Sequence, residues 1–296
     1  MENYTPVFRY PLTENDGWKK LSGELTVKMT NDYLFRALLQ SDNEVLKALL
    51  ASVLHMDKRD ICSARVTNPI LLGEHIDDRT YILDVSVVLN DRAHIDLEMQ
   101  VVKETWWADR SLLYICRSYD RMNRGSAYIN VKPVRQIAFC DFTLFRASPE
   151  FCADYMLINR KKPDVIYSDT FIISNIDLTR IDLATEEDRK YGIDNWALFF
   201  KAKTWEDMKM LAERDANLER AISGMWQLTE EEMIREQCRA REEWIINDNW
   251  KNETIEQQKQ ALEKFEINDK RKTETIEQLE RENALLKERL GLMQDS

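Results

Sequence analysis

The sequence predicts an α/β domain followed by a long C-terminal helix. Two segments, residues 80–89 and 93–102, alternate apolar and polar side chains with the period of a β-strand. Residues 31–54 instead place apolar side chains at helical spacing. Residues 229–292 contain no proline and a single glycine, Gly291, which favours one continuous helix. The chain has 296 residues, enough for one large domain with an appendage.

Helices and strands alternate along the predicted domain. One helix is expected over residues 31–40 with Thr30 as its cap, and a second from Val45 to Leu54 with a Ser41–Glu44 capping box. A helix over 106–122 follows the two strands. Further strands are expected over 134–145 and 169–176, and further helices over 194–202 and 204–222, the last opening with a Thr204–Asp207 capping box.

The two alternating strands define a row of polar side chains. If their apolar rows share the core, the polar rows share the opposite face, because side chains alternate strictly. That face then carries Asp84 of the first strand and Asp96, Glu98 and Gln100 of the second. A two-residue turn would set polar against apolar side chains. We therefore predict a three-residue loop over 90–92 or a bulge. The three-residue loop pairs residue 89 with 93 and Asp84 with Glu98.

Two carboxylates opposed across a strand pair repel each other unless a proton or a cation lies between them. Oxygen ligands at this density suit Mg²⁺ or another divalent cation, which keeps waters and binds substrate phosphates. Asp84 and Glu98 are therefore candidate metal ligands. The alternative is an exposed polar strand face without a ligand, since Asp and Glu are common on solvated strands.

The C-terminal segment predicts a coiled coil that joins two copies of the chain. A Thr229–Glu232 capping box marks its start. Asn283 at an a position favours a defined register, usually in a parallel dimer, although Asp269 and Lys272 interrupt the seam. A single solvated helix is the alternative. The last part of the seam consists of Ile276, Leu279, Asn283, Leu286, Leu290 and Met293. The expected organisation is an extension over 1–27, the α/β domain over 28–228 and the long helix over 229–296.

The composition excludes several classes of protein. Seven glycines provide neither G-x-G spacing nor a Walker A loop, so no nucleotide cofactor is expected. Five cysteines lack C-x-x-C spacing, which favours free buried thiols in a reducing compartment. The sequence shows no signal-peptide pattern and no apolar run of about 18 residues. We therefore expect a cytoplasmic protein without a membrane partner.

The net charge of −11 and pI near 5.0 argue against a generic DNA-binding protein, but the charge is uneven. Residues 103–162 carry 11 bases and 6 acids, whereas residues 228–296 carry 12 bases and 18 acids. Arg110, Arg117 and Arg121 recur at spacings of seven and four on the predicted helix and share a side. Arginine forks suit phosphate oxygens. The alternative is ion pairing of these arginines with neighbouring acids.

Four segments occur in a familiar order: TNDYLFRALL (30–39), ILDVSVVLNDRAHIDLEMQ (82–100), RSLLYICRSYDR (110–121) and CDFTLF (140–145). Together they resemble the recombination-promoting nuclease (Rpn) family of the PD-(D/E)XK superfamily, a family also described as transposase-like. The resemblance covers roughly residues 28–245. It implies a restriction-endonuclease-like core, in which a mixed central sheet is flanked by helices. It also implies a metal-dependent DNA endonuclease linked to recombination, mobile elements or phage defence.

By this resemblance, Asp84 and Glu98 are the metal ligands. Gln100 stands where the superfamily usually has lysine. A neutral amide can orient the attacking water or a phosphate oxygen, but it adds no positive charge. Asp32 lies in the family's N-terminal TND motif, from which it could reach the site through water. A favourable charge in the first turn of a helix is the alternative role for Asp32.

Two other functions remain open from the sequence. A nuclease fold without cleavage activity could bind DNA or a protein, with the helical tail as its interface. The missing lysine and the acidic balance favour this alternative. An RNA nuclease is a further possibility, because phosphate chemistry alone does not distinguish the sugar.

Overall fold

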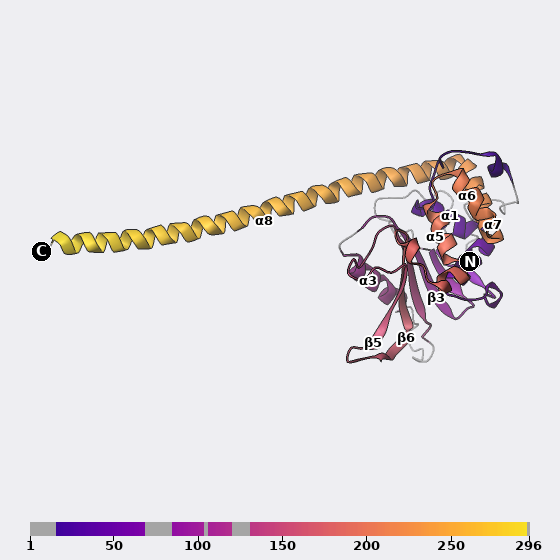
Figure 1. Ribbon diagram of the computed structural model, residues 1–296, viewed down its shortest axis with the longest axis horizontal. Helices are drawn as coiled ribbons and strands as arrows, with labels where there is room; N and C mark the ends of the chain where they lie inside the picture. The colour runs from indigo at the N-terminus through magenta and orange to yellow at the C-terminus, as the bar shows by residue number, and fades with distance from the viewer. Residues whose placement is uncertain (1–15, 69–84, 104–105, 120–130, 295–296) are drawn as a thin grey trace, which may run out of the picture. The chain divides into compact units, whose positions relative to one another are not determined.

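The computed structural model describes residues 16–68, 85–103, 106–119 and 131–294. The chain divides into two compact units, Met1–Glu242 and Glu243–Ser296. The first unit contains the sheet and the helices packed on it (Figure 1). Asp84 and Arg121, two of the predicted site residues, lie outside the described residues, as does the first half of the predicted strand over 80–89.

Six strands form one mixed sheet in the order β1-β2-β3-β4-β6-β5. β4 pairs in parallel with both β3 and β6, whereas the other pairs are antiparallel. The predicted mixed sheet of an α/β domain is thus confirmed. The strands are β1 (Ala64–Val66), β2 (Val85–Leu89), β3 (Ala93–Gln100), β4 (Val134–Cys140), β5 (Cys152–Asn159) and β6 (Lys162–Asp177).

The β2–β3 connection fixes which side chains face each side of the sheet. Leu89 pairs with Ala93, so residues 90–92 form the predicted three-residue loop. Asn90 and Asp91 have φ of 50° and 55°, in the left-handed region that Asn and Asp enter more readily than most side chains. The Asn90 side chain secures the loop by accepting from the backbone N–H of Ser63 at 3.0 Å. The register prediction is confirmed for the described residues.

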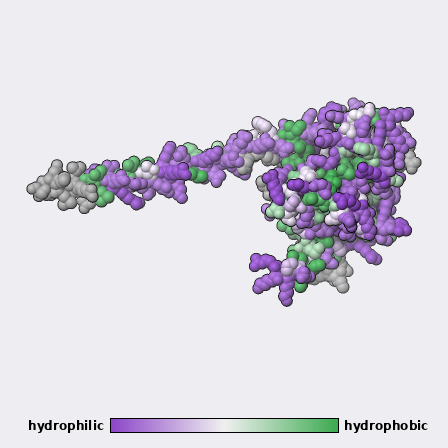
Figure 2. Space-filling model, in the orientation of Figure 1, coloured by the Kyte–Doolittle hydropathy of each residue, from purple (hydrophilic) through white to green (hydrophobic). Residues whose placement is uncertain are grey.

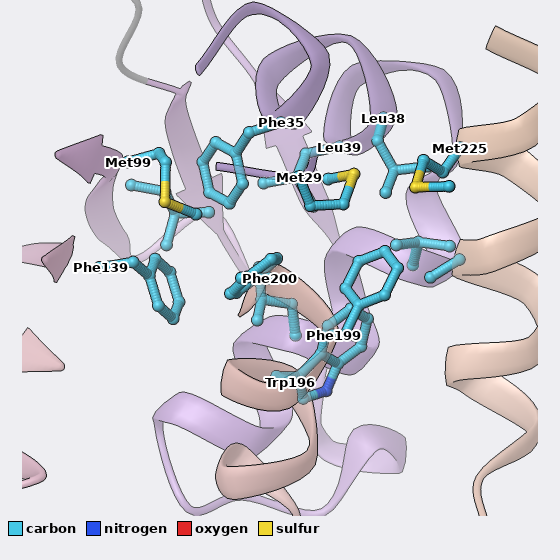
Figure 3. Packing of buried hydrophobic residues seen from close by; sticks show 14 of the residues in the cluster. Met29, Phe35, Leu38, Leu39, Met99, Phe139, Trp196, Phe199, Phe200 and Met225 are labelled. Atoms are coloured by element: carbon cyan, nitrogen blue, oxygen red, sulfur yellow. The ribbon is translucent and has the colours of Figure 1, made fainter. Parts of the chain in front are cut away.

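One face of the sheet carries the hydrophobic core (Figure 3). The rings of Phe35, Phe139 and Phe200 meet edge to face there, with centroids 4.9 to 5.9 Å apart. They come from α1, β4 and α5, so the core joins elements from distant parts of the chain. The helices of this layer are α1 (Asp32–Ser41), α2 (Asn43–Val53), α5 (Ile193–Lys201), α6 (Trp205–Ala212) and α7 (Ala216–Glu230). Four shorter helices pack beside them: η1 (Gly17–Lys20), η2 (Lys58–Asp60), η4 (Ile181–Leu183) and α4 (Glu186–Tyr191).

The starts of α1, α2 and α6 confirm one predicted cap and correct two. Thr204–Asp207 forms a full capping box at α6. At α1 the cap is Asn31 rather than Thr30, and at α2 it is Asp42 rather than Ser41. In both cases the observed cap is one residue later and carries an amide or carboxylate oxygen, which caps at least as well as a hydroxyl.

The other face of the sheet is covered by α3 (Trp107–Tyr119). This helix confirms the described part of the one expected over 106–122. Trp107 packs against Ala138, Cys140 and Phe142 in a small second core. The polar row of β3 therefore lies beneath a helix.

The last helix of the chain is α8 (Glu232–Gln294). Thr229 lies inside α7 and donates to the carbonyl of Trp226 at 2.8 Å, so the predicted Thr229–Glu232 box does not form. In the first unit, Ile234 and Cys238 of α8 are buried. In the second unit the helix exposes the apolar side chains Ile255, Leu262, Phe265, Ile276, Leu279 and Leu286. Within the described ranges, no helix combines the length and apolar character that a membrane span requires.

All five cysteines are free, as predicted, but they are not all buried. Cys62 and Cys116 are exposed, because the first follows the surface turn η2 and the second lies on the outward side of α3. Burial raises the pKa of the Cys152 and Cys238 thiols to about 12. These two thiols therefore stay protonated near neutral pH.

Candidate active site

The polar row of β3 is buried. Asp96, Glu98 and Gln100 alternate with core residues, so they point toward α3, and their exposed fractions are only 9%, 4% and 8%. The solvated strand face considered from the sequence is therefore wrong for these three residues. Buried carboxylates need hydrogen-bonding or charged partners, and the structure supplies both kinds.

Glu98 is held by side chains from two other elements. Arg110 of α3 donates from Nη2 to Glu98 Oε1 at 2.9 Å, and Gln136 of β4 donates from Nε2 to Oε2 at 3.3 Å. The Arg110 guanidinium also lies over the rings of Trp107 and Tyr114, 5.3 and 5.2 Å from their centroids. Arg110 thus faces inward and neutralises Glu98, which is the ion-pair alternative named from the sequence.

Asp96 is held by two hydroxyl groups. Ser86 of β2 donates to Oδ1 and Ser118 of α3 donates to Oδ2, both at 2.5 Å. Hydrogen bonds from hydroxyls to a carboxylate are short and strong. Asp96 therefore ties the strand pair to the end of α3, one row before Glu98.

Gln136 provides a test of whether a divalent cation fits here. Its Oε1 is buried and has no hydrogen-bond partner among the described residues. An amide oxygen without a partner, on a side chain that also contacts the Glu98 carboxylate, is a suitable ligand for a hard cation. Within the described ranges, no three His, Cys, Asp or Glu side chains gather closely enough to hold a metal ion. The donors present fit a cation, but a complete carboxylate pair requires Asp84, which lies outside these ranges.

Gln100 follows Glu98 on the same face, where its Nε2 donates to the carbonyl of Val102 at 2.7 Å. In this arrangement the amide group is engaged with its own strand end. Arg117 is exposed on α3 and so is accessible to a phosphate. Arg121 lies outside the described residues, so the expected three-arginine surface is described only at Arg110 and Arg117.

Asp32 lies in the first turn of α1 and is 6% exposed. Arg241 of α8 donates from Nε to both of its carboxylate oxygens, at 2.9 and 2.7 Å. The preceding residue, Asn31, donates to the carbonyl of Cys238 at 2.9 Å. Among the described residues, Asp32 therefore pairs with Arg241 of α8 and not with the β3 row.

Cys140 lies in the row next to Gln100, and its thiol donates to Asn175 Oδ1 at 2.9 Å. Burial first, and then the Glu98 and Asp177 carboxylates, raise the pKa of this thiol well above its usual value. Cys140 is therefore a neutral thiol and not a nucleophile near neutral pH.

Sequence reasoning missed Ser118, Gln136 and Arg241 as partners of the predicted carboxylates. The one signal for Gln136 is that a second polar side chain follows Arg135 before the apolar run over 137–140. Ser118 and Arg241 carry no such signal, because a single serine or arginine on a helix is ordinary. Their roles appear only when the helices are packed.

The chain has a mixed sheet in which β3 carries Glu98 and Gln100 beneath the helix α3. This arrangement is typical of a nuclease-like α/β protein. The chain belongs to the family described as PD-(D/E)XK nuclease family transposase, whose model matches residues 29–254. The matched range includes every strand of the sheet and reaches into α8. No curated protein and no solved structure matches the chain.

Proposed function

We propose that the protein is a metal-dependent DNA endonuclease that hydrolyses backbone phosphodiesters. The observation that carries this proposal is Glu98, a buried carboxylate in a chain of the nuclease family. It contacts Gln136, whose Oε1 has no hydrogen-bond partner among the described residues. Burying a carboxylate costs on the order of several kcal/mol of folding free energy before its partners compensate. A chemical role accounts for keeping that charge in the middle of the sheet.

Asp84 and Glu98 would hold Mg²⁺ or another divalent cation. If the β2–β3 register observed from Val85 to Leu89 continues by one pair, residue 84 would lie opposite residue 98. A cation bound there supplies positive charge that lowers the pKa of a water and neutralises a phosphate oxygen. Gln100 lies next in the row, and its amide would orient the water or the phosphate by hydrogen bonds.

Arg110 and Arg117 would hold the DNA backbone, together with Arg121, which lies outside the described residues. Arg110 is available for this role only after it leaves Glu98, whose charge it neutralises in the structure. Arg117 is exposed. For Asp32, the ion pair with Arg241 favours a role in holding α8 over a role in catalysis.

The seam of α8 would pair two copies of the chain, which would place two sites on one dimer and allow both DNA strands to be cut. The exposed apolar side chains at heptad positions, among them Ile276, Leu279 and Leu286, support this proposal. The exposed free thiols Cys62 and Cys116 fit a reducing compartment such as the cytoplasm.

Purified protein incubated with supercoiled plasmid tests the activity. We expect nicked and linear products with Mg²⁺ and none with EDTA. Glu98→Gln and Asp84→Asn should each lower the rate by about 100-fold or more, because each removes one proposed ligand. Glu213→Gln, an exposed acid after α6, is the matched control and should cut at the wild-type rate. Undiminished cutting by the Glu98→Gln/Asp84→Asn double variant would contradict the assignment.

A second function is a nuclease fold that binds DNA without cutting it. Two observations favour it: Arg110 neutralises Glu98, and Gln100 replaces the usual lysine. This function predicts tight DNA binding in EDTA together with no cleavage in Mg²⁺, Mn²⁺ or Co²⁺. Cleavage that depends on Glu98 would exclude it.

A further inference from the structure

The outer part of the β5–β6 pair projects from the sheet. β6 pairs with β4 only from Phe171 to Asp177, so residues 162–170 have β5 as their one strand neighbour in the described part of the chain. We name residues 156–170 the outer ribbon. Figure 1 shows β5 and β6 continuing past the other strands. A two-stranded ribbon alone is marginally stable in water, which suggests that this one is built to contact a partner.

The tip of the outer ribbon is basic. Arg160, Lys161 and Lys162 are consecutive and exposed, and none makes an ion pair within the described ranges. The Asn159 side chain accepts from the backbone N–H groups of Lys161 and Lys162 at 2.9 and 3.3 Å, which fixes the turn that carries them. Asp164 and Asp169 lie further back on β6, so the positive charge is concentrated at the tip.

Behind the tip, the outer ribbon exposes large apolar side chains. Tyr167 is 84% exposed, and Leu157, Ile158, Val165 and Ile166 are each about half exposed. Figure 2 shows hydrophobic and hydrophilic side chains together on this projection. A cationic tip with apolar side chains behind it matches DNA, whose backbone is anionic and whose grooves expose apolar sugar and base surfaces.

The alternative occupant is a second copy of the chain. Edge-to-edge pairing of two ribbons is disfavoured by Pro163 near the start of β6 and by the register shifts between Tyr155 and Asn159. Proline and bulges are the features that block strand addition at sheet edges. These features leave the faces and the tip, rather than the edges, as the contact surface.

We propose that the outer ribbon is an arm that binds duplex DNA away from the cleavage site, with its tip on phosphates. This inference rests on the proposed function and extends it. A two-stranded β-ribbon fits the major groove of B-DNA. Glu98 lies in the same row as Asn175, which is 13 residues from Lys162 along β6. At about 3.3 Å per residue the tip lies up to roughly 43 Å along the strand from that row.

This reach corresponds to about 13 base pairs, given about 3.4 Å per pair along the duplex. The arm therefore contributes only to duplexes long enough to extend from the site to the tip. A 30-base-pair duplex should engage it, whereas a 10-base-pair duplex centred on the site should not. Duplex length thus separates an arm from a general electrostatic attraction.

Binding of a fluorescent 30-base-pair duplex in EDTA, followed by anisotropy over a series of KCl concentrations, tests the proposal without cleavage. We expect R160Q/K161Q/K162Q to bind about 10- to 100-fold more weakly near 0.15 M salt. Its log–log salt slope should be smaller by up to about 2.7, because each phosphate contact contributes about 0.9. Tyr167→Ser should weaken binding several-fold without changing that slope. Neither variant should change binding to the 10-base-pair duplex.

The matched control is K20Q/R189Q/R214Q, which removes three exposed cations from the helical layer and should bind like the wild type. Circular dichroism and sedimentation establish that each variant is folded and has the wild-type oligomeric state. If the tip variant keeps the wild-type affinity and salt slope while the wild type still cuts plasmid, the arm is wrong and the nuclease proposal stands. If neither the variants nor the wild type binds DNA, both the arm proposal and the nuclease proposal fail. A tip variant that loses only self-association would show that a second copy occupies the ribbon, which also overturns the proposal.

Discussion

Arg110 Nη2 lies 2.9 Å from Glu98 Oε1, and the two side chains are 17% and 6% exposed. The Arg110 guanidinium thus pairs with the carboxylate that would bind a divalent ion. Because both charges are largely removed from water, each depends on the other. The helix that covers the row and the carboxylate at its centre are therefore energetically coupled.

Arg110→Met should lower the free energy of unfolding by about 3 kcal/mol, because it leaves Glu98 buried without its cation. Adding Glu98→Gln should recover most of that loss. Millimolar Mg²⁺ should raise the urea midpoint of Arg110→Met more than that of the wild type, because the carboxylate no longer has a competing cation. Urea unfolding followed by tryptophan fluorescence measures all three effects. An equal Mg²⁺ effect in Arg110→Met and in the double variant would contradict cation binding at Glu98.

Asp32 and Arg241 should act as a pair that fastens α8 to α1. Asp32→Asn and Arg241→Gln should each reduce hydrogen-exchange protection in the first turns of α8, because each leaves a buried charge without its partner. The two variants should also lower plasmid cleavage to a similar extent. A much larger loss of cleavage in Asp32→Asn, with α8 equally protected in both, would instead assign Asp32 to catalysis.

The seam of α8 offers a matched pair of adjacent leucines. Leu286 lies at a d position and Leu285 lies outside the seam, and the two are 55% and 60% exposed in the single chain. Leu286→Glu should dissociate the proposed dimer in sedimentation velocity, because it would bury a charge between the two helices. Leu285→Glu should leave the dimer intact. Equal sedimentation of both variants and the wild type would remove this seam as the interface.

Stability should fall at alkaline pH through the buried thiols. The pKa of Cys152 and Cys238 is raised from an ordinary 9.0 to about 12, so below pH 9 both thiols are protonated in the folded and unfolded chains. Between pH 9 and 12 only the unfolded chain releases these protons, which favours unfolding. Each thiol should cost about 3 kcal/mol by pH 11. Urea unfolding at pH 8 and 11 should show a smaller decline for Cys238→Ala; an unchanged decline would contradict this origin.

The register of β2 with β3 was predictable because alternation excludes a two-residue turn, which would set apolar side chains of one strand against polar side chains of the other. The buried state of the row was not predictable, because it depends on α3 packing across the sheet. The Asp32–Arg241 pair joins residues 209 positions apart, and nothing local to either residue indicates it. Strand β5 was also missed, since Tyr155, Leu157 and Ile158 do not alternate apolar with polar.

The three-residue loop after β2 has a consequence for how this protein can change over time. Deleting one residue from 90–92 would shift β2 against β3 by one position and exchange its two faces. Ser86 would then enter the core and Val85 or Val87 would face Asp96. Substitutions at Asp91 and Arg92 alter only the surface of the loop, provided that residue 91 still accepts a left-handed backbone. A substitution at Asn90 also removes its hydrogen bond from Ser63. Natural variants should therefore differ in the amino-acid sequence of this loop but not in its length.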